Sequence, residues 1–371
     1  MKQHHFLPVF LTLIVFYLSL HFYAARWLLK FYFPPQAAAW LRSALLLLAF
    51  FSPFTMYLKR HYHSPLLEPL YTAGYAWMGV ILIAAFVFAC SDLAGFFTRR
   101  YHLLEDRRLA QLTLAALCLV LASAFYGGFK IPPIKEISVP FKDLPPELEG
   151  YRIAQISDMH IDSARKLRQF GKIVHELNAA RPDLVLVTGD FIDPGLTCQD
   201  AVGRETAEIK SPDGIYGVPG NHEYYYGLEE AMGCYRAFGI KPLHNESADL
   251  KKLRLVGFGD IHTENLSEAD ATALLKKHKD GKFTVIMTHQ PLYYQAMAGT
   301  GNYLGLSGHT HRGQIFPFNL LTRLFYRYFY GLYRINGSAF YVTSGAGSWG
   351  PPLRWLAPAE VPLLILKKQL P

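Results

Sequence analysis

The stretch Leu184-Val185-Leu186-Val187-Thr188-Gly189-Asp190 decides the fold class. Its first five residues form a continuous, largely apolar run, which is typical of a strand buried on both faces of a sheet. The glycine that follows predicts a tight turn directly after the strand. Because open α/β sheets bind their ligands at the carboxyl ends of the strands, Asp190 is predicted to lie in a ligand site.

Four more polar clusters close apolar, strand-like runs. They are Asp158-Met159-His160, Gly220-Asn221-His222-Glu223, Thr288-His289 and Gly308-His309-Thr310-His311. Carboxylates, an amide and imidazoles are ligands that suit Mn, Fe, Zn or Mg, and no thiolate occurs among them. A single cluster of this kind is more often a strand cap or a turn. Five in sequence predict a metal site built at strand ends.

The chain beyond residue 150 alternates between strand-like and helical patterns. Strands are predicted at residues 152–157, 184–188, 215–218, 253–258, 283–288 and 303–307, and helices at 163–180, 228–238 and 268–279. Short apolar strands with helices between them indicate an α/β layered fold whose sheets are covered on both faces.

The residue types within the clusters predict individual roles. Asp190 has two oxygens and can be shared by two ions about 3.5–4 Å apart, the spacing at which a metal pair activates one nucleophile. His222 titrates near neutrality and is predicted to donate a proton to a leaving alkoxide. The alternative is that His222 only supports a neighbouring ligand. Glu223 is predicted to orient a neighbouring group.

Residues 1–130 have the composition of a membrane domain. The chain of 371 residues is 51% apolar, and apolar stretches run at about 6–23, 37–57, 70–91 and 110–127. Each is near the roughly 20 residues that cross a bilayer as a helix. We predict four transmembrane helices, a linker at 131–150 and a catalytic domain at 151–371. A signal peptide for the first stretch and buried core helices for the others are the alternatives.

Basic residues are concentrated in the membrane part. Residues 1–130 hold 11 Lys and Arg against 4 Asp and Glu, a net charge of +7 out of a total of +8. This favours anionic lipid headgroups as a partner over nucleic acid, which requires a basic stripe on the catalytic domain. The basic residues of the loops nearly balance, so the side that the catalytic domain faces is open. Whether Cys198 and Cys234 pair is also open.

The five clusters resemble, in this order, the motifs of the calcineurin-like metallophosphoesterase family. The resemblance covers residues 135–371 and implies a four-layer αββα sandwich that binds two divalent ions. It implies that the first ion is held by Asp158, His160, Asp190 and His311. It implies that the second ion is held by Asp190, Asn221, His289 and His309. In this resemblance His222 assists catalysis.

Two segments are similar to a membrane-associated branch of that family. They are the residues Gly308–Gln314 and the tail from Gly345 to Arg354. The branch includes transmembrane proteins with a metallophosphoesterase domain and hydrolases of UDP-2,3-diacylglucosamine. Arg312 stands where the branch commonly has glycine. Arg312 and Arg354 are predicted to contact the substrate phosphate.

Residues 315–333 interleave aromatic and aliphatic side chains with Arg323 and Arg327, directly after the last polar cluster. Two interpretations are open. The segment forms a surface at the bilayer interface that admits a lipid tail, or it packs against the protein's own core or membrane helices.

Together these patterns predict an integral, multi-pass membrane protein of the bacterial inner membrane that hydrolyses a phosphate ester or pyrophosphate. The predicted substrate is a phosphorylated lipid or a lipid-linked nucleotide such as UDP-2,3-diacylglucosamine. Two alternatives are a tethered hydrolase of soluble phosphoesters and a non-catalytic membrane signalling protein with a phosphoesterase-like domain.

Overall fold

The chain folds into two compact units in the computed structural model, which describes residues 6–62, 64–194, 198, 200–278 and 280–369. The first unit comprises Met1–Phe129 together with Gly350–Trp355. The second comprises Lys130–Trp349 together with Leu356–Pro371.

The first unit contains the predicted helices, each long and apolar enough to cross a membrane. They are α1 (Phe6–Phe31), α2 (Ala38–His61), α3 (Glu68–Arg100) and α4 (Asp106–Phe129), with short 3-10 turns η2 (Pro35–Ala37) and η3 (Pro65–Leu67). Helix α1 continues through Lys30 and α3 through Arg100, beyond the predicted apolar stretches. Long basic side chains reach toward polar surroundings, so a helix need not end where its apolar run ends.

Close helix contacts hold the first unit together. The ring of Trp27 in α1 stacks on that of Phe88 in α3, with centroids 4.0 Å apart. A Cβ atom on Gly74 of α3 would come within 1.8 Å of Thr55 Oγ1 in α2, and the Ser52 hydroxyl donates to the Gly74 carbonyl at 2.7 Å. Small residues at such crossings are typical of membrane helices, because close backbone approach replaces the hydrophobic effect there.

The second unit is built on two six-stranded sheets. In order, the first sheet contains β1 (Ile134–Phe141), β12 (Val361–Lys368), β2 (Arg152–Ile156), β3 (Leu184–Thr188), β4 (Ile215–Val218) and β5 (Lys241–Pro242). The second contains β10 (Gly331–Ile335), β11 (Ser338–Val342), β9 (Tyr303–Ser307), β8 (Thr284–Met287), β7 (Arg254–Gly257) and β6 (Glu246–Asp249). Strands β2, β3 and β4 are parallel, and so are β7, β8 and β9. The carboxyl ends of each trio therefore share one edge.

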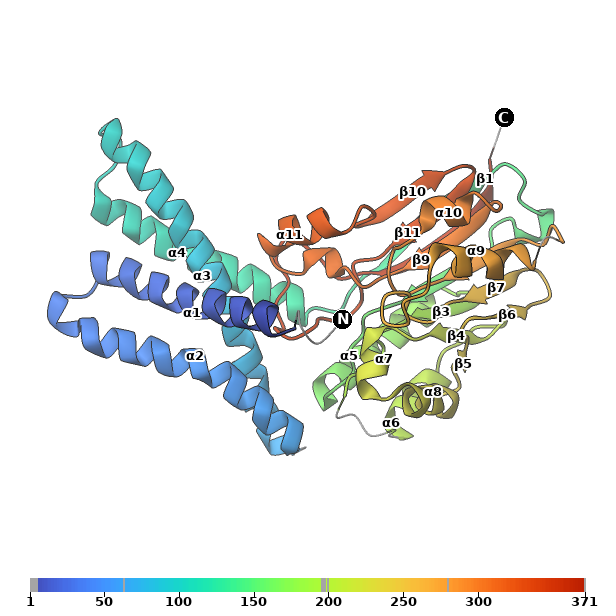
Figure 1. The fold of residues 1–371 in the computed structure, drawn as a ribbon, viewed down its shortest axis with the longest axis horizontal. Helices are drawn as coiled ribbons and strands as arrows, with labels where there is room; N and C mark the ends of the chain where they lie inside the picture. Colours follow the sequence, from blue (N-terminus) through green and yellow to red (C-terminus); the bar gives the residue numbers. More distant parts are fainter. Residues whose placement is uncertain (1–5, 63, 195–197, 199, 279, 370–371) are drawn as a thin grey trace. The chain divides into compact units, whose positions relative to one another are not determined.

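Helices cover the outer face of each sheet (Figure 1). They are α5 (Ala164–Ala179), α6 (Asp200–Ala207), α7 (Asn221–Tyr226), α8 (Leu228–Ala237), α9 (Glu268–Lys276) and α10 (Tyr294–Ala298). The unit also contains α11 (Phe318–Phe325), which has no buried residue, and the turns η4 (Pro146–Leu148) and η5 (His311–Gly313). Leu186 and Leu306 belong to one core between the sheets. Val187 packs in a second core with α5 and α8, and Ile286 in a third with α9 and α10. The predicted four-layer αββα sandwich is confirmed.

The predicted linker at 131–150 is wrong over much of its length, because it contains β1. Ile134 to Phe141 pair in parallel register with Val361 to Lys368, and Val139 and Phe141 are buried in the core between the sheets. Pro140 is tolerated because β1 is an edge strand, where a missing N–H breaks no ladder on the open side. The prolines that suggested a linker thus mark a sheet edge.

The structure shows whether the two cysteines of the second unit pair, which the sequence left open. Cys198 and Cys234 form a disulfide across a separation of 36 residues. It fastens the chain before α6 to helix α8, whereas Cys90 and Cys118 are free thiols.

We expect Leu306→Ala to lower the free energy of unfolding of the second unit by about 2–5 kcal/mol, because it opens a cavity between the sheets. The side chain is fully buried in β9. Thermal or denaturant unfolding of the full chain in detergent measures the change. Leu332→Ala in β10 is the matched control, since Leu332 is 38% exposed; equal losses for both variants would contradict the assignment of the core.

Candidate metal centre

The polar clusters follow the strands whose carboxyl ends share an edge. Asp158 comes after β2, Asp190 after β3 and Asn221 at the start of α7 after β4. His289 and His309 follow β8 and β9 in the second sheet. The strand topology thus brings together side chains that lie more than 100 residues apart in the sequence.

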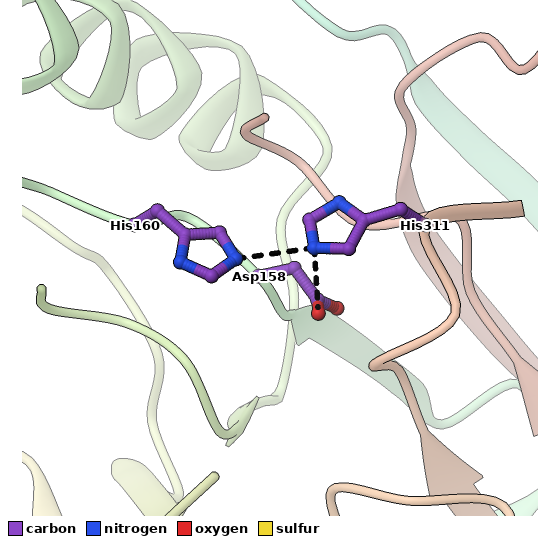
Figure 2. A group of neighbouring side chains, drawn as sticks. All are labelled: Asp158, His160 and His311. Atoms are coloured by element: carbon purple, nitrogen blue, oxygen red, sulfur yellow. Dashed lines mark hydrogen bonds and ion pairs between the residues drawn. The ribbon is translucent and has the colours of Figure 1, made fainter. Parts of the chain in front are cut away.

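Asp158, His160 and His311 form a first group of buried side chains that can hold a metal ion, with all their ligand atoms within 4.8 Å of one another. Figure 2 shows the two rings and the carboxylate turned toward one point. His160 Nε2 lies 3.1 Å from His311 Nε2, and His311 Nε2 lies 3.4 Å from Asp158 Oδ1.

Asp190, His289 and His309 form a second group of the same kind. His289 Nε2 lies 3.1 Å from Asp190 Oδ2 and 3.1 Å from His309 Nδ1. The same Asp190 oxygen lies 3.8 Å from His160 Nε2 of the first group. One carboxylate therefore faces both groups, as the sharing of a ligand between two ions requires.

The hydrogen bonds of His160 and His289 engage Nδ1 of each ring and leave Nε2 available to a metal ion. The Nδ1–H of His160 donates to Asp193 at 2.9 Å, and the Nδ1–H of His289 donates to the Thr188 carbonyl at 2.9 Å. These bonds fix the tautomer in which Nε2 carries a lone pair. Each such Nε2 lies 3.1 Å from another ring nitrogen, so either a proton or a metal ion between the two nitrogens must offset the repulsion of their lone pairs.

Asn221 offers a further oxygen atom that could bind a metal ion. Its side-chain Oδ1 is buried and has no hydrogen-bond partner among the described residues. A buried acceptor without a donor is costly, about 1–3 kcal/mol, and commonly marks a missing water or ion. Asn221 directly follows Gly220, which packs against the Asp190 carboxylate, so the Asn221 backbone starts beside the second group. A bond from the Asn221 amide oxygen to an ion there stays a prediction.

Electrostatics differ between the two buried carboxylates. Burial raises the pKa of Asp158 above its usual value, despite the nearby imidazoles. Burial also opposes ionisation of Asp190, but His289, His222 and His160 outweigh it and hold that pKa below its usual value. Burial and then the charge of His289 lower the pKa of His309 to about 3. His309 is therefore neutral near pH 7, the form that binds metals.

The backbone at the site adopts an unusual conformation. Five of the predicted ligands have φ between 47° and 68°, in the left-handed region: Asp158, His160, Asp190, His309 and His311. Such residues cost roughly 1 kcal/mol or more each and collect at functional sites. Close approach adds to the constraint, because a Cβ atom on Gly308 would come within 2.2 Å of the Asp158 carboxylate.

Glu223 orients the loop that carries Asp190, as predicted. Its buried carboxylate accepts hydrogen bonds from the backbone N–H groups of Asp190 at 2.9 Å, Phe191 at 2.9 Å and Gly220 at 2.7 Å. Burial and the neighbouring Asp190 raise the pKa of Glu223 to about 7. Two of the polar clusters are thereby fastened to each other through the backbone.

Sequence reasoning missed Asp193. Its Oδ1 lies 2.6 Å from His222 Nδ1 and 2.9 Å from His160 Nδ1, so one carboxylate orients both rings. With Nδ1 engaged in this way, His222 directs Nε2 toward Asp190, 4.0 Å away. The spacing Gly189-Asp190-x-x-Asp193 was the signal available in the sequence. In the structure, a β-bridge between Ile161 and Ile192 keeps this segment extended beside the first cluster.

Sequence reasoning also missed a polar chain behind His309. His309 Nε2 lies 2.7 Å from the Tyr326 hydroxyl, which donates to Gln290 Oε1 at 3.5 Å. The Gln290 amide in turn donates to the buried carboxylate of Asp260 at 3.0 Å. In the tautomer with Nδ1 free, His309 donates to Tyr326, so this chain holds the ring with Nδ1 toward the second group.

The two arginines that were predicted to contact the substrate lie in different units of the structure. Arg312 lies in η5 beside His311, where its guanidinium stacks over the ring of Tyr330, 4.4 Å from the centroid. Arg354 belongs to the first unit, in which its N–H donates to the Ala124 carbonyl of α4 at 2.9 Å. A phosphate contact by either arginine stays a prediction.

The aromatic segment 315–333 divides into two parts, and the packing interpretation describes only one of them. Tyr328 is buried and packs against the rings of Tyr294 and Tyr333 in the core of the second unit. Helix α11 has no buried residue, and Leu324 and Phe325 are 81% and 82% exposed. The packing interpretation holds for the end of the segment but not for its helix.

Comparisons with known proteins agree with this geometry. A model of the calcineurin-like phosphoesterase family matches residues 151–313, which include all seven predicted ligands. An uncharacterized metallophosphoesterase of Campylobacter jejuni is 31% identical over 307 residues, 81% of each chain. One of Helicobacter pylori is 37% identical over 65% of this chain, which spans only 66% of that relative's length. A Danio rerio transmembrane protein with metallophosphoesterase domain is 29% identical, over 78% of this chain and 71% of that protein.

We expect Asp190→Ala to abolish the binding of a pair of ions, because it removes the carboxylate that faces both groups. His309→Ala is expected to weaken only the second group. Metal analysis of the purified chain after equilibration with manganese measures both. Asp249→Ala, an exposed aspartate paired with Arg254, is the control. Full metal content in the Asp190 variant would exclude the shared-ligand arrangement.

Proposed function

The chain belongs to the calcineurin-like phosphoesterase family, and we propose that it is a membrane-anchored, two-metal hydrolase of phosphate esters or pyrophosphates. The proposed substrate is a phosphorylated lipid or a lipid-linked nucleotide. The family binds two divalent ions, which agrees with the two groups of ligands described above. No thiolate is present in either group, which suits Mn, Fe, Zn or Mg.

The position of Asp190 carries the proposal. Its Oδ2 faces His289 at 3.1 Å and His160 at 3.8 Å, one from each group. We infer that Asp158, His160 and His311 hold one ion, that Asn221, His289 and His309 hold the other, and that Asp190 is shared. Two divalent ions in such a site supply charge stabilisation for the phosphoryl oxygens and an activated water as nucleophile.

His222 is proposed as the general acid. Burial opposes a charge on its ring, but Asp193, Asp190 and Glu223 outweigh burial and raise the pKa of His222 above its usual value. Asp193 at Nδ1 keeps the ring oriented, so that Nε2–H faces the site and donates its proton to the leaving alkoxide. His222 stays 8% exposed, so its proton can be replaced from solvent.

Membrane anchoring supports a lipid substrate. The four apolar helices are long enough to span a bilayer, and a similar protein is named a transmembrane protein with metallophosphoesterase domain. A substrate that resides in the bilayer would gain from an enzyme held at its surface, because both are confined to the same layer. The choice of UDP-2,3-diacylglucosamine and the bacterial inner membrane rest on the sequence resemblance.

The two alternatives make different demands on the site. A non-catalytic signalling protein needs no complete ligand set, yet the imidazole and carboxylate donors are all present in the two groups. A tethered hydrolase of soluble phosphoesters needs the same site and differs only in what it binds, so only substrate preference separates it from the proposal.

We expect His222→Asn to lower turnover of a chromogenic phosphodiester, assayed with added manganese, by about 10²–10⁴-fold while both ions stay bound. Asp193→Asn is expected to lower turnover less, by about 10–100-fold, because the ring loses its orienting carboxylate but keeps its acid. Loss of metal in the His222 variant would make it a ligand or a structural support instead. Unchanged turnover would remove it from the mechanism.

We expect the reconstituted chain to hydrolyse micellar UDP-2,3-diacylglucosamine or phospholipids faster than soluble nucleotides at equal bulk concentration. Initial phosphate or nucleotide release measures the preference. The Asp190→Ala variant provides the background rate for each substrate. A preference for the soluble nucleotides would favour the tethered hydrolase, and no turnover of any of them with both ions bound would favour the signalling protein.

A further inference from the structure

We propose that helix α11 is a docking surface for an anionic bilayer. This α11 surface consists of the side chains of Phe318, Leu320, Leu321, Leu324 and Phe325. The proposal rests on the proposed membrane anchoring but does not depend on the metal chemistry.

The α11 surface is apolar and unpartnered within the part of the chain that the structure describes. Its five side chains are between 49% and 82% exposed. Single exposed apolar residues are common, but several on one short helix form a contiguous patch of the kind that marks an interaction site.

The helix is held to its own domain by its other side. Asn319 lies so close to η5 that a Cβ atom on Gly313 would come within 2.1 Å of its Cα atom. Asn319 and Thr322 are half-buried. The polar side of α11 therefore packs on the turn that carries His311, and the apolar side is left facing outward, as in helices that lie at a membrane interface.

Charge identifies the occupant as a lipid surface. Residues 318–327, which comprise α11 and the two residues after it, contain Arg323 and Arg327 and neither Asp nor Glu. A second copy of the chain placed on the same patch would bring these cations against one another. Anionic headgroups neutralise them, and four membrane-spanning helices keep such headgroups within reach of the chain.

The α11 surface lies directly beside the metal centre. Helix α11 ends at Phe325, and the next residue, Tyr326, contacts His309 Nε2 through its hydroxyl at 2.7 Å. A bilayer on the α11 surface thus places lipid headgroups near the ligands of the second group and deepens the proposed preference for membrane-borne substrates.

The test measures the depth of α11 in a bilayer and needs no catalytic readout. Phe325→Cys, and separately Leu321→Cys, carry an environment-sensitive fluorophore in the full chain with Cys90→Ala and Cys118→Ala. The chain is reconstituted into vesicles of phosphatidylglycerol and phosphatidylcholine that contain brominated lipids. We expect at least two-fold stronger quenching at 325 and 321 than at the control Glu268→Cys, an exposed residue on α9.

Three further outcomes bear on the proposal. Weaker quenching in vesicles of phosphatidylcholine alone would support recognition of anionic headgroups. Equal quenching at 325, 321 and 268 would overturn the proposal. Protection of the 325 and 321 labels from aqueous iodide without quenching by brominated lipid would overturn it in favour of a protein partner. Because none of these readouts uses turnover, a failure here is distinct from a failure of the proposed phosphoesterase activity.

Discussion

The buried carboxylate of Asp190 is the group on which the rest of the second unit depends. It is 2% exposed and lies within 4.0 Å of ring nitrogens of His160, His222 and His289. A buried carboxylate is costly unless polar partners compensate for its lost hydration, and here the partners come from three loops at once. The two sheets must therefore pack so that the loops after β2, β4 and β8 meet the loop after β3.

The surrounding backbone is organised to hold that arrangement. Glu223 accepts N–H groups from both the Asp190 loop and the Gly220 loop, and the Asp158 carboxylate accepts the His309 N–H at 3.0 Å. These bonds fasten clusters from different strands to each other rather than to their own elements. They offset the strain of the left-handed residues, because a loop held at both ends cannot relax to an ordinary conformation.

Part of the site could be read from residue types and spacing. The runs that precede Asp158, Asp190, His289 and His309 are recognisably buried strands, so the placement of these residues at strand ends followed directly. Asp193, Gln290 and Tyr326 were not predicted from the sequence. Each acts through a partner that is distant in the sequence, or lies in a segment whose pattern does not distinguish it from its neighbours. Tyr326 was one of many aromatic residues in its segment, and only its contact with His309 distinguishes it. The linker prediction failed for a similar reason, since β1 is a strand only because β12 returns from the end of the chain to pair with it.

The sequence by itself determined the chemistry and the topology class: apolar helices at the front, short buried strands behind them, and oxygen and nitrogen ligands where those strands end. Local patterning suffices for these features, because hydrophobic periodicity and ligand type are properties of neighbouring residues. Only the tertiary structure decided that Asp190 faces both ligand groups, that Asp193 orients both His160 and His222, and that the apolar side of α11 faces outward. The first relation is set by how the two sheets pack, the second by the order of β2, β3 and β4 within one sheet, and the third by the packing of α11 on η5.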